Sequence, residues 1–202
     1  MGSARIFGPD GRLAKLDIQP EENRDPWLDI ALTRMGGTPN NLWKRSAVEA
    51  IGGWDESLRS SQEYDLLFRL LRNGASVAYD AEPLTDVHRQ AAGSITSSDP
   101  VGKWRRHITL RARIIEHLVA ERSPRDLAPF RQALFDAIRF LYPHDRQGAL
   151  RLYSTLLPPD YVPGVSTATG RGYLLLHRLL GFGFANRVRG WLKPPQLPGL
   201  RN

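Results

Sequence analysis

The sequence contains no cysteine, and none of its apolar runs is long enough to cross a membrane as a helix. Without cysteine there is no disulfide, no thiolate nucleophile and no cysteine-ligated zinc or iron–sulfur site. A spanning helix needs about 20 apolar residues, whereas uninterrupted stretches such as residues 173–176 are far shorter. The first ten residues also lack the pattern of a signal peptide. We therefore expect a cytoplasmic globular protein, and 202 residues suffice for one or two domains.

Acidic residues are scarce in the second half of the chain. Residues 1–100 carry 11 Lys and Arg against 15 Asp and Glu, whereas residues 101–202 carry 17 against 6. The net charge of +7 therefore arises from the second half. Such a half is attracted to polyanions, including anionic lipid, although helices with solvated arginine faces give the same count. No helix-turn-helix or zinc-finger signature occurs, so no specific nucleic-acid partner is expected.

Short apolar runs between turn residues predict an α/β first half. Residues 4–7 and 13–18 flank a Pro-Asp-Gly turn, which predicts a β-hairpin. Asp25 before Pro26 predicts the start of a helix that ends before Gly36. The other predicted elements are helices over residues 46–51 and from Ser60 or Ser61 to Asn73, and strands over residues 77–79 and 84–88.

Apolar residues at helical spacing predict a helical second half. The clearest stripe consists of Leu127, Phe130, Leu134, Ile138 and Leu141. Other predicted helices contain Leu110, Ile114 and Leu118, then Leu150, Tyr153 and Leu157, and finally residues 173–192. The change of character near Pro100 predicts domains at 1–99 and 100–193, followed by a proline-rich, disordered tail at 194–202.

Four segments follow one another in an order that resembles a known enzyme family. They are residues 41–46, residues 51–56 with Gly-Gly-Trp-Asp-Glu, residues 62–66 with Gln-Glu-Tyr-Asp-Leu, and residues 88–96. This order resembles the C-terminal half of the catalytic domain of family 2 glycosyltransferases, which have the GT-A fold. The resemblance covers about residues 1–97. It implies a partial GT-A domain of the α/β class, followed by a basic helical extension.

The resemblance also implies a reaction and residues that perform it. Family 2 enzymes of this type transfer a sugar, with inversion, from a nucleotide sugar to a glycan or lipid-linked acceptor. Glu63 matches the second acid of the family's acidic pair and is therefore the expected general base, whereas Gln62 replaces the first acid. The expected substrate-binding residues are Gly53, Trp54, Asp55, Glu56 and Arg89, with Arg89 facing the diphosphate.

Each of these residues also has an ordinary structural interpretation. Ser60 and Glu63 fit a capping box, in which Ser60 is the N-cap and Glu63 occupies the third helical position. Asp65 and Arg69 are i,i+4 partners that fit a surface ion pair. The structural alternative for Trp54 is a residue of the core, and the alternative for Arg89 is a surface residue of a strand.

The family's donor-binding half has no counterpart in this sequence. No Asp-x-Asp motif occurs, so the ligands for the divalent Mg or Mn expected in a complete enzyme are not in this chain, and the five histidines show no metal-binding spacing. The resemblance therefore implies a fragment, whose activity alone is left open.

The alternative function is non-catalytic binding through the helical region. In this interpretation, a basic helical module docks on a membrane surface or a protein partner and carries a truncated transferase half. The last predicted helix combines leucine, phenylalanine and arginine, which suits a helix lying on the inner face of the membrane. The same helix also fits a packing role against the preceding helices.

Overall fold

The computed structural model describes residues 1–18, 24–58, 60–89 and 99–192. It is mixed α/β and divides into two compact units, Met1–Asp99 and Pro100–Asn202. The division falls at the step where the sequence changes to helical character. The α/β class of the first half and the helical character of the second are confirmed. The expected tail at 194–202 and the residues after Arg89 up to 98 lie outside the described residues.

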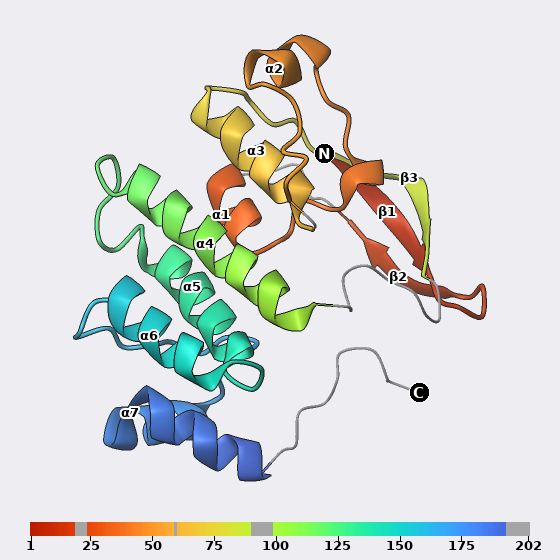
Figure 1. Cartoon of the computed structure of the whole chain (residues 1–202). Helices are drawn as coiled ribbons and strands as arrows, with labels where there is room; N and C mark the ends of the chain where they lie inside the picture. The colour runs from red at the N-terminus through yellow and green to blue at the C-terminus, as the bar shows by residue number, and fades with distance from the viewer. Residues whose placement is uncertain (19–23, 59, 90–98, 193–202) are drawn as a thin grey trace. The chain divides into compact units, whose positions relative to one another are not determined.

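The first unit contains a three-stranded sheet in the order β2–β1–β3 (Figure 1). β1 (Gly2–Phe7) pairs antiparallel with β2 (Leu13–Asp17) and parallel with β3 (Asp80–His88). In the turn, the Arg12 N–H donates to the Asp10 carboxylate at 3.1 Å, and Gly11 adopts a φ of 74°. Both features are those of the predicted Pro-Asp-Gly turn, so the hairpin is confirmed.

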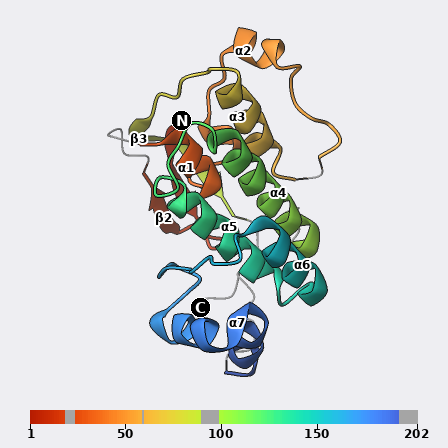
Figure 2. The ribbon, with the colours of Figure 1, turned by 90° about the vertical axis from the view of Figure 1, so that its left-hand side faces the viewer.

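Helices α1 (Pro26–Ala31) and α3 (Gln62–Arg72) supply most of this unit's core. The Asp25 carboxylate caps α1 by accepting a hydrogen bond from the Trp27 N–H at 3.0 Å, as predicted. The 3₁₀ turn η1 (Thr38–Asn40) and α2 (Arg45–Ala50) connect the two helices. α2 buries none of its side chains and lies at the outer end of the unit (Figures 1 and 2).

α1 ends before Gly36, as predicted, and does so already at Ala31, because the chain then turns through Thr33, whose φ is 56°. One predicted strand of the first unit is wrong. Residues 77–79 form no strand, and one strand covers Asp80–His88 instead. The reason is register: β1 begins at Gly2, which pairs with Asp80, so the chain before Asp80 has no ladder to join. After a register shift, regular pairing with β1 resumes at Thr85, opposite Ala4.

The second unit consists of α4 (Pro100–Leu118), α5 (Ala128–Leu141), α6 (Arg146–Leu156) and α7 (Arg171–Leu192). The predicted stripes of α4 and α5 are buried throughout, which confirms them. α7 is kinked at Gly181, where φ is 74° and ψ is 174°, a conformation suited to glycine. No helix in the described ranges has both the length and the hydropathy to cross a bilayer.

Burial of His107 in α4 makes the stability of the helical unit depend on pH. Burial, together with the positive charges of Arg111, Lys103 and Arg106, lowers the pKa of His107 from 6.5 to about 3. A depressed folded-state pKa contributes stability that is present above the unfolded-state pKa and is lost as the pH falls. Between pH 6.5 and about pH 4.5, we expect the free energy of unfolding to drop by about 1.4 kcal/mol per pH unit.

The measurement is the urea midpoint at which the amides of α5 lose hydrogen-exchange protection, taken at several pH values. His107→Gln should flatten the dependence over this pH range. His144→Gln, at an exposed position, is the control and should leave the dependence unchanged. An equally steep dependence in His107→Gln would refute the assignment.

Candidate functional site

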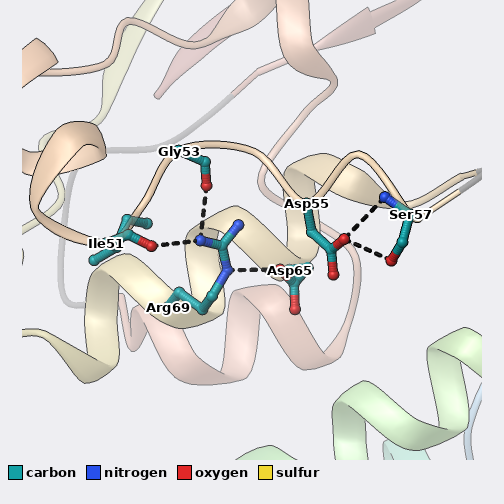
Figure 3. Close-up of polar contacts among 6 residues, drawn as sticks. All are labelled: Ile51, Gly53, Asp55, Ser57, Asp65 and Arg69. Atoms are coloured by element: carbon teal, nitrogen blue, oxygen red, sulfur yellow. Dashed lines mark hydrogen bonds and ion pairs between the residues drawn. The ribbon is translucent and has the colours of Figure 1, made fainter.

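Arg69 of α3 joins that helix to the 51–56 loop (Figure 3). Its Nε donates to the Asp65 carboxylate at 2.7 Å, and its Nη1 donates to the carbonyl oxygens of Ile51 at 2.9 Å and Gly53 at 2.7 Å. The side chains of Arg69 and Asp65 are only 20% and 12% exposed. The predicted i,i+4 pair is confirmed, but its placement on the surface is wrong. One guanidinium instead fastens the loop to the helix.

Two consecutive glycines shape the start of this loop. Gly52 and Gly53 have φ values of 78° and 74°, which side chains with a Cβ rarely adopt. Neither glycine has an atom near the position of an added Cβ, so the requirement for glycine is conformational rather than one of space. This turn follows the end of α2, close to the predicted helix end at residue 51, and allows the carbonyl groups of Ile51 and Gly53 to converge on Arg69.

The rest of the loop presents a carboxylate and an indole to solvent. The Asp55 carboxylate accepts hydrogen bonds from the Ser57 hydroxyl at 2.6 Å and the Ser57 N–H at 2.9 Å. These bonds, helped by the charge of Arg69, lower the pKa of Asp55. Trp54 is 39% exposed and meets Trp43 edge to face, with ring centroids 6.0 Å apart. Trp54 is therefore not a core residue. Glu56 is exposed beside them.

Glu63 lies in the first turn of α3, and the predicted capping box is wrong. The N-cap is Ser61 rather than Ser60, its φ is 63°, and its side chain makes no capping hydrogen bond. A capping side chain usually starts from an extended backbone, which Ser61 does not have. Within the described part of the chain, the half-buried Glu63 side chain makes no hydrogen bond or ion pair. Its carboxylate is thus not used in capping α3.

Arg89 lies apart from this arrangement. It directly follows β3, its N–H donates to the Phe7 carbonyl at 3.0 Å, and its side chain is exposed. Its neighbour His88 stacks on Phe7 with ring centroids 4.9 Å apart. Among the residues described, no hydrogen bond or ion pair connects Arg89 to the 51–56 loop. The structure therefore links Gly53 and the loop to the helix of Glu63, whereas Arg89 marks the end of the parallel strand pair.

Two residues at this site were not identified from the sequence. The sequence predicts only an ion pair for Arg69, because spacing along a helix indicates i,i+4 partners but not backbone carbonyls from another segment. No sequence pattern indicates the contact of Trp43 with Trp54, because it depends on the fold of the connecting chain. The doublet Gly52-Gly53, which precedes the predicted helix start at Ser60 or Ser61, is the sequence signal of a tight turn here.

In the ranges that the structure describes, no three histidine or acidic side chains lie close enough together to hold a metal ion. In comparisons with known proteins, no family model, no curated protein and no solved structure matches the chain.

Proposed function

We propose that this chain is the acceptor-side part of a glycosyltransferase of the family 2 type, with Glu63 as its general base. The observation that carries the proposal is the Arg69 bridge. It fastens the loop containing Gly-Gly-Trp-Asp-Glu to the helix whose first turn holds Glu63. Two motifs that the resemblance treats as parts of one site therefore belong to one local structure.

The proposed reaction is the inverting transfer of a sugar to an acceptor hydroxyl. Glu63 takes the proton from the hydroxyl as its oxygen forms a bond to the anomeric carbon. The bond from that carbon to the diphosphate breaks, and the nucleoside diphosphate leaves with the electron pair. A positioned base contributes about 10²–10⁴ to such a rate. The absence of competing contacts to Glu63 among the described residues suits this role.

The loop residues suit contacts to a sugar. An ionised Asp55 accepts hydrogen bonds from sugar hydroxyls, and Gly53 and Glu56 line the same loop. The exposed face of Trp54 offers apolar surface to a sugar ring. Arg89 is proposed to meet the diphosphate. A complete enzyme would receive charge stabilisation for the leaving group from a divalent metal, and we assign no residue of this chain to that metal.

The test compares Glu63→Gln with the wild type in the complete natural protein that contains this chain. The assay measures release of nucleoside diphosphate from a panel of nucleotide sugars in the presence of membrane-derived acceptors. Glu63→Gln should lower the rate at least about a hundredfold, because glutamine keeps the shape but cannot accept the proton. The thermal unfolding midpoint should stay unchanged, since the side chain caps nothing.

Glu116→Gln provides the matched control, because Glu116 is an exposed glutamate on α4 in the other unit. It should retain the wild-type rate. Wild-type turnover in Glu63→Gln would refute the role of Glu63 as the base. Failure of the wild type to consume any nucleotide sugar would refute the proposed function as a whole.

A further inference from the structure

α7 has an inner face that is fixed against the other helices of its unit. Its buried residues are Tyr173, His177, Phe182, Ala185 and Asn186. Tyr173, His177 and Phe182 pack their rings around Phe135 of α5, with centroid separations of 6.3, 5.5 and 5.8 Å. Within the helical unit, α7 lies on the far side of α5 and α6 from α4 (Figures 1 and 2).

Polar contacts on this inner face determine how α7 is rotated. The Arg139 guanidinium of α5 lies 3.9 Å from the centre of the Tyr173 ring, and its Nε donates to the Asn186 side chain at 3.2 Å. Asn186 in turn donates to the Tyr173 hydroxyl at 3.0 Å. A buried polar group that loses its hydrogen-bond partner destabilises the folded state. Rotation of α7 about its axis would break these contacts, so its outer face cannot turn inward.

The outer face of α7 exposes large apolar side chains. Leu175, Leu179, Leu180 and Phe184 are 60%, 68%, 49% and 47% exposed. Leu175 and Leu179 are i,i+4 neighbours and therefore adjacent on the helix surface. Singly exposed leucines are ordinary, but α7 exposes four large apolar side chains within ten positions, three before the break at Gly181 and Phe184 after it. Such a concentration of exposed apolar side chains is typical of an interaction surface.

The exposed apolar residues of α7 lie among arginines, and the surrounding sequence has no acidic residue. Arg171 and Arg178 are i−4 and i+3 to Leu175, so both flank it, and Arg187 follows Phe184 by three residues. All three arginines are exposed. The sequence contains no Asp or Glu from residue 161 to residue 202. We call the exposed set Arg171, Leu175, Arg178, Leu179, Leu180, Phe184 and Arg187 the basic apolar face.

We propose that the basic apolar face binds the surface of an anionic lipid bilayer. The leucines and Phe184 enter the boundary between headgroups and acyl chains, while the arginines contact lipid phosphates. Both kinds of side chain are needed for an interfacial helix, whose binding combines buried apolar area with attraction to anionic lipid. Because α7 is broken at Gly181, each of its halves packs against the helical unit at its own angle. The exposed side of each half then faces the bilayer.

Charge favours a bilayer over other occupants. In a two-fold dimer the same patch lies on both sides of the interface, so a second copy would bring together two positively charged faces with no acidic residue to offset them. A nucleic-acid backbone would satisfy the arginines but leave four apolar side chains without a role. An anionic lipid surface satisfies both kinds of side chain. This inference stands on the helical unit alone and does not depend on the proposed transferase function.

The test is flotation of the full chain with vesicles. Vesicles of phosphatidylcholine containing one quarter phosphatidylglycerol should bind the protein, and vesicles of phosphatidylcholine alone should bind it at least about tenfold more weakly. Raising the salt from about 0.1 to about 0.5 M should weaken binding to the anionic vesicles, because screening shortens the range of the attraction. The double variant Leu175→Gln/Leu179→Gln should bind about tenfold more weakly than the wild type.

The matched control is the double variant Leu42→Gln/Leu84→Gln, which changes two leucines of the first unit that are 99% and 69% exposed. It should bind as the wild type does. Far-UV circular dichroism verifies that α7 stays helical in each variant. No binding at low salt would overturn the proposal. Unchanged binding by the α7 variant would also overturn it, because the protein would then attach to the vesicles through charges elsewhere. A third contradicting result is that the α7 variant loses self-association while neither protein binds lipid.

Discussion

Replacement of Arg69 by alanine should lower the free energy of unfolding of the first unit by about 3 kcal/mol. The change removes two hydrogen bonds from a charged donor to the carbonyl oxygens of Ile51 and Gly53, and it deprives the Asp65 carboxylate of its ion-pair partner. Breaking a fully buried pair costs about 3–5 kcal/mol. Because the two side chains remain 20% and 12% exposed, we expect the lower end of this range.

Arg45→Ala is the matched control for this prediction. Arg45 also pairs with a carboxylate at i,i+4, that of Glu49, but both side chains are open to solvent and, among the described residues, the arginine donates to no loop carbonyl. Its removal should cost less than about 1 kcal/mol. Urea unfolding gives the free energies, and hydrogen exchange at residues 51–58 reports whether the loop is released. Equal costs for the two variants would mean that the bridge does not hold the loop.

Phe135→Ala should destabilise the helical unit by about 4 kcal/mol, because it empties the centre of an aromatic cluster. Phe135 is fully buried, and five rings contributed by α6, α7 and the chain between them surround it at centroid distances of 5.5–6.3 Å. Phenylalanine-to-alanine changes in cores cost about 3–5 kcal/mol, since the transfer free energy and the cavity both count. The surrounding tyrosines also anchor polar contacts, which restricts collapse of the cavity.

The control for this cavity is Phe140→Ala on the same helix. Phe140 is exposed and stacks on Trp104 with ring centroids 4.8 Å apart. Its loss should cost about 1 kcal/mol, the value of an aromatic pair at the surface. Urea unfolding followed through the exchange of α6 and α7 amides measures both variants. A similar cost for the two changes would contradict the central position of Phe135.

The sequence predicted well those features that depend on residues close together along the chain. The hairpin turn at Asp10 and Gly11, the Asp25 cap and the apolar stripe of α5 all depend on residues a few positions apart, and all are confirmed. The expected strand at 77–79 failed because the register with β1 decides where β3 begins. The capping box failed because Ser61 adopts a left-handed conformation that no local pattern announced.

In the candidate site, too, the local feature was predictable from the sequence and the long-range contact was not. The Gly52-Gly53 turn was predictable because only glycine readily adopts two successive positive φ values. The link from this turn to Arg69 was not, since it joins backbone carbonyls to a side chain 16 and 18 positions away. The roles of Glu63, Trp54, Asp55, Glu56 and Arg89 come from the resemblance and stay predictions.

The parallel pairing of β1 with β3 also affects how the protein folds. Arg5 of β1 bonds Asp86 of β3 across 81 positions, so the sheet closes only after a long segment has been organised. In the helical unit α4 packs on α5 and α5 on α6, which are neighbours along the chain. Contacts between near neighbours form faster than distant ones. The helical unit, although it is synthesised second, should therefore reach its native structure first. Until β3 joins the sheet, the edge of β1 that faces β3 stays unpaired.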